Sequence, residues 1–406
     1  MGGVYLNAVF LMVVVSTRYL AIPKLLSVFN AEQMMLQYVD VLFNTPFISY
    51  KTLKECILFT KYKNDGSNLN QMPLYVLLFA KIPEYLHFYV FALVDILTLM
   101  YFIKLAVPTK VGASLKTKFW LYLFNPLTFL NLVMQTQFVF TQFFIVAALY
   151  YCQNYKLNTN NVYKAATAIA MSAYLDVYNI GLSLICLNFF LETKLKQAYI
   201  IAFIATMFVL YAISYQINPY FIENVIFACV LFKEQYPNIG LWWYFFIEMF
   251  QEYRNFFKFV FNGYCYIFTI PIYLRFKNYP LQAAVILFTW ITMFKPYPSI
   301  GELGLILTVF VSLFDMNIVD NKLIMWLLVI HSLVLLPVFY HLWITVGSGN
   351  SNFFYAMTLV YVVSIALILL GMIKSVLYKE YVEVNDLEKE AKDGDKPQKK
   401  LNLVCV

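Results

Sequence analysis

The sequence has 406 residues, of which 62% are apolar and only 13% are charged, and its formal net charge is +7. Soluble domains average about 45–50% apolar and about 25% charged residues. This contrast excludes a water-soluble enzyme, a disordered protein and a nucleic-acid-binding module, and it predicts a polytopic membrane protein. The six cysteines show no CxxC spacing, so we interpret them as small apolar residues rather than as metal ligands or a disulfide framework.

Twelve segments are apolar enough to cross a membrane as helices, for which about 20 mostly apolar residues are needed. They are 3–22, 85–107, 119–135, 137–153, 165–177, 179–192, 197–217, 256–274, 280–294, 300–314, 322–344 and 353–376. The stretches 72–80 and 219–250 are interrupted by Lys, Pro, Asn or Gly and are expected to be re-entrant or interfacial. Counting 219–250 as two spans would give fourteen helices. The predicted fold is an all-α transmembrane domain over residues 1–378.

Basic residues in the short loops set the expected orientation. With the N-terminus in the cytosol, thirteen basic residues fall in the cytosolic turns and one, Lys295, falls in the tight turns of the other side. We therefore expect both termini in the cytosol. The loops expected on the opposite, lumenal side are 23–84, 218–255, 295–299 and 345–352. The segment 379–406 is rich in charges of both signs and is expected to be a disordered cytosolic tail.

The sequence lacks a recognisable arrangement of nucleophile, base or metal ligands, which an active site requires. Cys56 lies in the expected lumenal loop 23–84, and no orienting group accompanies it. Multispan glycosyltransferases often use paired acids in the first lumenal loop, and no such pair occurs here. No catalytic residue, metal or cofactor is predicted. A glycosyltransferase that uses a dolichol-phosphate sugar, with Asp40 as its base, is kept as the alternative.

Two carboxylates, Asp95 and Asp176, lie within the predicted spans, where ionisable groups are costly and often functional. The favoured interpretation is that each one hydrogen-bonds a tyrosine, an asparagine or a helix end inside the bundle. A transporter or channel that uses both carboxylates is a third hypothesis.

The first of three notable lumenal segments is 237–250, which contains Trp242, Trp243, Tyr244 and Glu248. If this segment is a helix, its aromatic side chains occupy nearly every face of the helix, and Glu248 lies on the same face as Tyr244. Such a helix at a membrane surface would offer rings to acyl chains and a carboxylate to a polar headgroup.

The second and third segments are 294–302 and 341–355. In the second, Lys295 and Tyr297 lie in a proline-rich turn before a new helix, and a helix start beside a lysine favours an anion such as a phosphate. The third follows His341 and Trp343 with a turn rich in Gly and Asn, whose amides could bind sugar hydroxyls or a phosphodiester. A capped helical hairpin, with Ser351 or Asn352 as N-cap, explains it equally well.

At these three segments the sequence resembles the PIG-U family, the multispan subunit of the glycosylphosphatidylinositol (GPI) transamidase. The family pattern Pro-Asn-Ile-Gly-Leu-aromatic-Trp-Tyr-Phe-Phe-x-Glu-Met-Phe is met at 237–250. The pattern Phe-Lys-x-Tyr-Pro-[Ser/Thr]-x-Gly-acidic is met at 294–302, and His-Leu-Trp-Ile followed by Gly-Ser-x-Asn-Ser-Asn-Phe-Phe-Tyr-Ala is met at 341–356. In the N-terminal half only looser features match, such as Asp40.

The resemblance implies an endoplasmic reticulum membrane protein with a scaffold similar to that of the type C glycosyltransferases. It implies a complex that cleaves a C-terminal propeptide and joins the new carboxyl end to a GPI anchor, with the chemistry in a cysteine-protease-like partner subunit. This chain is then a non-catalytic subunit that binds or presents the GPI lipid and the proprotein signal. Its implied partners are the other transamidase subunits, the GPI glycolipid and membrane lipids, with no nucleic acid.

The same resemblance suggests which residues contact the lipid. Asn350 and Asn352 are the first candidates for the GPI headgroup. Weaker candidates for the lipid site or for subunit contacts are Ser351, Phe353, Trp343, His341, Trp242, Trp243, Tyr244, Glu248, Lys295 and Tyr297.

Overall fold

The computed structural model describes residues 18–19, 40–62, 69–105, 115–233 and 235–393, and all regular structure within them is helical. Helices suit an apolar chain because each one satisfies its backbone hydrogen bonds internally. Most of the predicted first span, 3–22, lies outside the described residues. In the N-terminal half the helices are α4 (Tyr50–Lys61), α5 (Pro73–Ala80), α6 (Glu84–Lys104), α7 (Leu115–Leu123), α8 (Pro126–Val133), α9 (Phe138–Gln153) and α10 (Asn160–Leu175).

The rest of the chain contains both short helical elements and longer helices. They are η2 (Val177–Asn179), α11 (Ile180–Cys186), η3 (Leu187–Phe189), α12 (Thr193–Ile217), η4 (Ile222–Phe227), α13 (Ala228–Val230), α14 (Trp242–Glu248), α15 (Gln251–Ile267), α16 (Thr269–Arg275), α17 (Pro280–Phe294), α18 (Ile300–Leu313), α19 (Lys322–Tyr340), η5 (His341–Thr345) and α20 (Ser351–Asp393).

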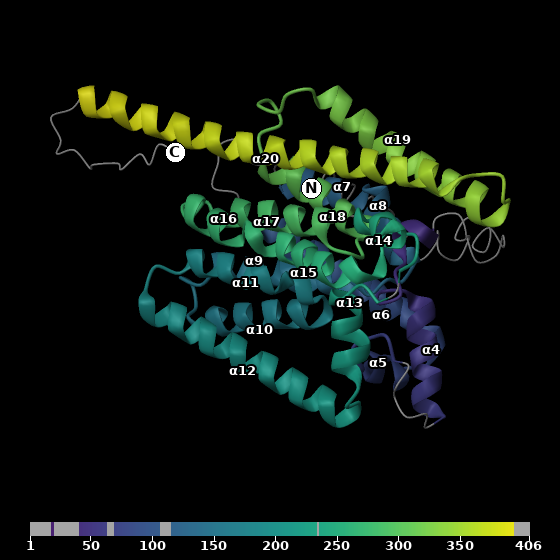
Figure 1. Ribbon diagram of the computed structural model, residues 1–406. Helices are drawn as coiled ribbons and strands as arrows, with labels where there is room; N and C mark the ends of the chain where they lie inside the picture. Colours follow the sequence, from purple (N-terminus) through teal and green to yellow (C-terminus); the bar gives the residue numbers. More distant parts are fainter. Residues whose placement is uncertain (1–17, 20–39, 63–68, 106–114, 234, 394–406) are drawn as a thin grey trace, which may run out of the picture.

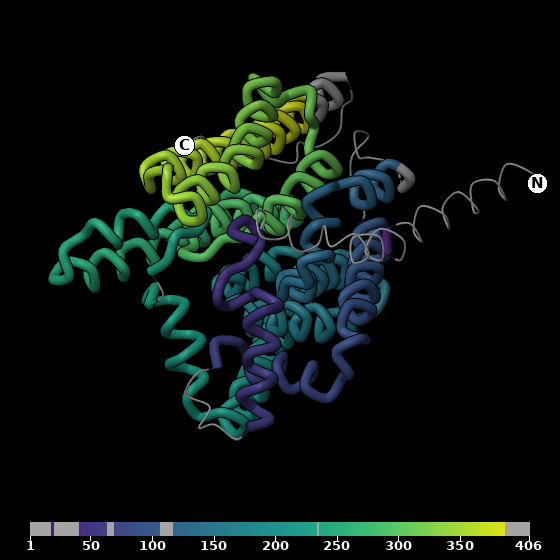
Figure 2. Tube along the Cα trace, turned by 90° about the vertical axis from the view of Figure 1, so that its right-hand side faces the viewer, coloured from purple at the N-terminus to yellow at the C-terminus, as the bar shows by residue number. Residues whose placement is uncertain are grey.

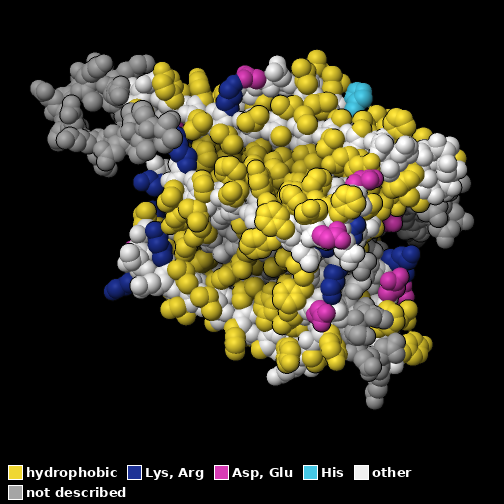
Figure 3. All heavy atoms as spheres, viewed as in Figure 1, with side chains coloured by type: hydrophobic (Ala, Val, Ile, Leu, Met, Phe, Trp, Pro, Cys, Tyr) yellow, Lys and Arg dark blue, Asp and Glu magenta, His cyan; other side chains and the backbone are white. Residues whose placement is uncertain are grey.

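Among the described residues, four helical stretches are long and apolar enough to cross a membrane, which makes the chain a membrane protein of the helical class. They are Glu84–Lys104, Thr193–Ile217, Lys322–Thr345 and Ser351–Asn385. Shorter apolar helices occur at Phe138–Gln153, Val177–Phe189, Pro280–Phe294 and Ile300–Leu313. Apolar side chains cover most of the face shown in Figure 3.

Several predicted spans are interrupted. The segment 119–135 is divided between α7 and α8 because Pro126 has no N–H to continue a helix, and the Asn125 side chain accepts the Leu127 N–H at 2.9 Å to start a new one. The segment 256–274 is divided at Phe268 into α15 and α16. The expected tail also differs, since α20 continues as helix to Asp393 instead of becoming disordered at residue 379.

The helices pack in layers, and α20 forms one edge of the molecule (Figure 1). It lies against α19 and α17, while α9 and α10 pack together in the centre and α10 also contacts α12. Figure 2 shows α19 and α20 together at the top of the second view, away from α4 and α5. Few residues of α12 are fully buried, and the side that does not pack against α10 is exposed to the surroundings.

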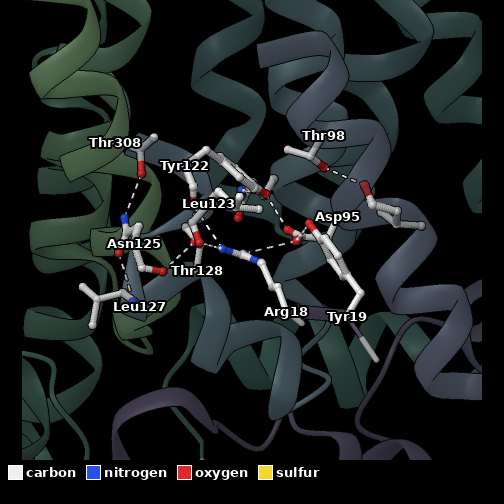
Figure 4. Close-up of polar contacts among 12 residues, drawn as sticks. Arg18, Tyr19, Asp95, Thr98, Tyr122, Leu123, Asn125, Leu127, Thr128 and Thr308 are labelled. Atoms are coloured by element: carbon white, nitrogen blue, oxygen red, sulfur yellow. Dashed lines mark hydrogen bonds and ion pairs between the residues drawn. The ribbon is translucent and has the colours of Figure 1, made fainter. Parts of the chain in front are cut away.

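A buried polar cluster joins the N-terminal segment to α6, α7 and α8 (Figure 4). The Arg18 guanidinium lies 3.2 Å from Asp95 Oδ2, and both side chains are 4% exposed. The same carboxylate accepts hydrogen bonds from the hydroxyls of Tyr19 and Tyr122, while Arg18 also donates to Thr128 Oγ1 at 3.2 Å. The interpretation of Asp95 as a structural hydrogen-bonding residue is confirmed, and its ion-pair partner is Arg18.

We expect Asp95→Asn to lower the free energy of unfolding by about 3–5 kcal/mol, because it leaves the Arg18 charge buried without a counter-ion. Denaturant titration of the purified protein in detergent measures the change. The matched control is Glu84→Gln, which breaks the exposed Lys54–Glu84 pair at the same 3.2 Å separation. The control substitution should lower the free energy of unfolding by less than about 1 kcal/mol. Equal losses for the two variants would contradict a structural role for the buried pair.

Candidate functional site

The three segments singled out by the sequence, 237–250, 294–302 and 341–355, meet in space around α14. Trp242 Nε1 in the first segment donates a hydrogen bond to the carbonyl of Phe294, which begins the second segment. The distance between the two atoms is 2.6 Å. On the other side of α14, the ring of Trp243 stacks on Trp343 from the third segment, with centroids 6.0 Å apart. The helix α14 therefore connects segments that are about 50 and 100 residues away along the chain.

Four rings from the first and third segments form an aromatic platform, consisting of Trp243, Trp343, Phe354 and Tyr355. The Trp243 centroid lies 5.7 Å from that of Phe354 and 5.8 Å from that of Tyr355, in a perpendicular arrangement for the second pair. Such aromatic pairs contribute about 0.5–1.5 kcal/mol each beyond area burial. Trp243 and Phe354 are at most 1% exposed, so these two rings pack the fold together, while Trp343 and Tyr355 are half-buried.

Polar side chains at the start of α20 form an amide rim above the platform, consisting of Asn350, Ser351 and Asn352. The Asn350 side-chain oxygen accepts from the Asn352 N–H and from the Ser351 hydroxyl, both at 3.1 Å. Asn350 is therefore the N-cap of α20, which corrects the prediction of Ser351 or Asn352. The side-chain oxygen of Asn352 accepts from the Tyr244 hydroxyl on α14.

These hydrogen bonds use the acceptor atoms of the amide rim and leave its donor groups available. Both asparagines are exposed, and the oxygen of each is used within the protein. The two NH₂ groups, which can only donate, therefore remain for partners outside the chain. The amide rim suits a ligand rich in acceptors, such as hydroxyl oxygens, phosphate oxygens or peptide carbonyls.

Tyr244 links the amide rim to the platform. Its ring stacks on Tyr355 with centroids 4.6 Å apart, and its hydroxyl reaches Asn352. Loss of solvent and then the neighbouring Glu248 carboxylate raise the pKa of the Tyr244 hydroxyl, so that group stays protonated and able to donate. Glu248 lies one helical turn after Tyr244, on the same face of α14 as the sequence predicts.

The tight turn before α20 holds Trp343 beside the amide rim. The N–H groups of Ser348 and Gly349 both donate to the Leu342 carbonyl, at 3.0 and 2.9 Å. A side chain at Gly349 would place its Cβ 2.9 Å from the Trp343 backbone nitrogen, which is too close, and Gly347 has the left-handed φ of 72°. Two glycines are therefore required by the backbone path itself.

The remaining predicted residues are arranged differently. Phe353 is 59% exposed and stacks on Phe339 with centroids 5.9 Å apart, while His341 begins the short element η5. Tyr297 is buried and packs edge-on against Phe47 at 5.0 Å. Tyr297 is thus inside the fold rather than at the amide rim.

Lys295 is also buried, and its counter-ions come from the chain itself. Its ammonium lies 2.8 Å from Asp176 Oδ2 and also contacts the Glu302 carboxylate in the first turn of α18. Burial alone would lower the pKa of Lys295, but the two carboxylates outweigh it and raise that pKa above its usual value near 10.5. The anion expected beside Lys295 is therefore a pair of protein carboxylates, and Lys295 holds the turn between α17 and α18.

Sequence reasoning missed these ion pairs. It treated Asp176 and Lys295 as separate candidates, and it had no reason to join Arg18 to Asp95 from 77 residues away. The usable signal was that charges inside apolar segments need partners of opposite sign. Among the described residues no group of three or more His, Cys, Asp or Glu side chains could hold a metal ion.

Comparison with known proteins gives the family. Residues 17–361 match the family model of the GPI transamidase subunit PIG-U. The chain belongs to the PIG-U family. GPI transamidase component GAB1 of Saccharomyces cerevisiae is 35% identical over 367 residues, which cover 87% of this chain and 90% of the yeast protein. The family resemblance stated from the three segments is thereby confirmed.

Mammalian relatives are more distant. GPI-anchor transamidase component PIGU of Mus musculus is 29% identical over 294 residues, covering 68% of this chain and 66% of the mouse protein. The corresponding protein of Homo sapiens is 29% identical over 293 residues, covering 67% of this chain and 65% of the human protein.

We expect Lys295→Met to destabilise this PIG-U family member by about 3–5 kcal/mol, because it leaves Asp176 and Glu302 buried without their shared counter-ion. Thermal unfolding of the purified protein in detergent measures the effect. Since the pKa of Lys295 is raised, its contribution is fully present below about pH 10.5 and is lost only as the pH rises through the higher folded value. The matched control is Lys277→Met, at an exposed lysine before α17. A midpoint of unfolding like that of the control would contradict the ion-pair role.

Proposed function

We propose that this chain is the multispan, non-catalytic subunit of the GPI transamidase complex in the endoplasmic reticulum membrane. In this proposal the amide rim and the outer rings of the aromatic platform bind the GPI headgroup and present it for transfer to a protein. Membership of the PIG-U family supports the assignment of this chain to the transamidase complex. The observation that carries the lipid-binding step is the pair of exposed asparagines whose side-chain oxygens are used internally, which leaves their NH₂ groups as donors.

The chemistry of the headgroup fits this surface. A GPI headgroup is a phosphodiester followed by sugars, so it is dense in oxygen acceptors. Donor-only amides pair with such oxygens, and aromatic rings pack against the apolar faces of sugars or against acyl chains. Tyr244, Trp343 and Phe353 border the amide rim with partly or largely exposed rings. Amphipathic aromatic residues of this kind gather where a membrane meets water.

The wider architecture is also part of the proposal. We propose twelve membrane spans with both termini in the cytosol, on a scaffold like that of the type C glycosyltransferases, with residues 1–378 forming the membrane domain. This topology would put all three segments on the lumenal side. The bond-breaking step would belong to a cysteine-protease-like partner subunit, with other transamidase subunits completing the complex. The chain would need no cofactor for this role.

No structural observation favours the two alternative functions. Asp40, the base of the alternative glycosyltransferase, is exposed and accepts a hydrogen bond from the Asn44 side chain. Asp95 and Asp176, the carboxylates of the alternative transporter, each form an ion pair with a basic residue of the chain.

We expect Asn352→Asp to leave the complex assembled and to lower GPI attachment about tenfold or more. The substitution keeps the size and the acceptor oxygen but replaces the outward NH₂ donor by a negative charge, which repels a phosphodiester. Loss of a hydrogen bond to a charged group costs about 1.5–3 kcal/mol, and 1.4 kcal/mol corresponds to a tenfold change. Surface display of a GPI-anchored reporter in cells that carry only the variant measures attachment, and co-purification of the partner subunits measures assembly.

The matched control is Asn158→Asp. Asn158 is an exposed asparagine whose side-chain oxygen accepts the Asn160 N–H at 2.9 Å at the start of α10, as Asn350 does for α20. Aspartate caps a helix as well as asparagine does, so this control should attach anchors normally. Normal attachment in both Asn352→Asp and Asn350→Asp would refute the headgroup assignment while leaving the family membership intact.

A further inference from the structure

Helix α15 has an aromatic side and a polar side. Large aromatic side chains recur along one side of it and are exposed, including Phe256 at 64% and Phe259 at 81%. Tyr253 and Tyr264 on the same side are also exposed. This helix is not among those that are apolar enough to span a membrane, and residues 251–258 lie at the beginning of the proposed span 256–274. An amphipathic helix with exposed aromatic rings is typical of the interface between acyl chains and headgroups.

The opposite side of α15 carries a donor stripe, consisting of Gln251, Arg254, Asn255 and Lys258. Their spacing of i, i+3, i+4 and i+7 places the four side chains on one face of the helix. The stripe contains two positive charges and two amides. No acidic residue occurs in it. Glu252 lies outside the stripe, in register with Phe256 and Phe259 on the aromatic side.

The two cations of the donor stripe lack an anionic partner in the described part of the chain. Arg254 is half-buried and donates to two carbonyls at the end of α14, to Met249 O at 3.1 Å and to Ile247 O at 3.5 Å. Lys258 is also half-buried, and its ammonium makes neither an ion pair nor a hydrogen bond among the described residues. Because the two residues are one turn apart, their charges repel each other.

This arrangement contrasts with the other buried cations. Arg18 and Lys295 are both neutralised by carboxylates of the chain. Two neighbouring positive charges beside exposed aromatic rings, with no carboxylate among the described residues to neutralise them, favour an anion from outside the chain. Arginine is especially suited to phosphate because its planar guanidinium can donate two parallel hydrogen bonds.

We propose that the donor stripe of α15 binds the phosphodiester of a membrane lipid, with Arg254 and Lys258 holding the phosphate and Gln251 and Asn255 donating at its edge. The exposed aromatic side of α15 would lie among the acyl chains. The lipid can be the inositol glycolipid itself or a bulk anionic phospholipid, because both carry this phosphodiester. The proposal does not depend on the amide rim.

The donor stripe is next to the candidate site without overlapping it. Phe261 of α15 stacks on Trp242 of α14 with centroids 4.1 Å apart, and Phe257 lies edge-on to Phe245 at 5.9 Å. The amide rim contacts α14 through Tyr244, whereas Arg254 contacts the carbonyls at the end of the same helix. A lipid phosphate at the stripe would therefore lie within one short helix of the amide rim.

Fluorescent short-chain phosphatidylinositol, titrated into the purified transamidase complex in neutral detergent, tests the proposal through its anisotropy. We expect the double variant Arg254→Gln/Lys258→Gln to bind the probe about tenfold or more weakly, because two charge-assisted contacts are lost. Asn255→Asp is the second variant. It places a carboxylate in the stripe at an exposed position that folding does not depend on, and it should weaken binding in the same direction.

Lys194→Gln, at an exposed lysine near the start of α12, is the matched control and should bind the probe as the wild type does. GPI attachment in Asn352→Asp tests the amide rim by itself, whereas probe affinity in the double variant tests the donor stripe, so the two proposals can fail separately. Competition by unlabelled phosphatidylserine as strong as by phosphatidylinositol would support a bulk lipid as the source, and competition by phosphatidylinositol alone would support the inositol glycolipid.

Three results would overturn the proposal. The first is unchanged probe affinity in both the double variant and Asn255→Asp. The second is competition by inorganic phosphate at the same concentration as by lipid, which would show a general anion site. The third is loss of a partner subunit from the double variant with unchanged lipid affinity, which would assign the cations to a protein carboxylate.

Discussion

The packing of Trp243 against Trp343 and Phe354 is the interaction on which the candidate site depends. It holds α14, a helix of only seven residues, against the hairpin that begins α20. An isolated helix of this length would not be stable in water. Its position therefore comes from tertiary contacts: Trp243 on one side, Trp242 and its hydrogen bond to Phe294 on the other, and the Arg254 bonds to its last carbonyls. Only with α14 fixed does the Tyr244 hydroxyl reach Asn352.

Buried charges provide the framework around this helix. The Arg18–Asp95 pair connects the N-terminal segment with three early helices, and Lys295 joins the loop after α10 to the start of α18. Buried ion pairs contribute little net stability compared with apolar packing, but removing one partner strongly destabilises the fold because the other charge stays buried. They therefore specify which helices are neighbours. This explains why a chain with so few charges keeps several of them far from water.

Helix positions were largely predictable from apolar runs, but helix breaks and charge partners were not. The predicted spans 137–153, 197–217 and 280–294 agree closely with α9, α12 and α17, because long apolar runs constrain a helix directly. The sequence Asn125-Pro126 divides the predicted span 119–135. Hydropathy did not predict this break, because it does not reflect the missing backbone N–H of proline. The residues of the amide rim were identified from their local pattern, whereas the burial of Lys295 and Tyr297 depends on contacts with Asp176 and Phe47, more than 100 residues away.

The two polar surfaces that remain differ in the chemistry they offer. The amide rim presents neutral donors whose side-chain oxygens are held by internal hydrogen bonds, which suits hydroxyl or phosphate oxygens that must be held in a defined arrangement. The donor stripe presents two positive charges on flexible side chains, which suits a phosphate whose position is set by the membrane. A glycolipid has both kinds of group, separated by the length of its sugars. In the proposed function, holding such a lipid at two points would remove much of its freedom before a partner subunit acts on it.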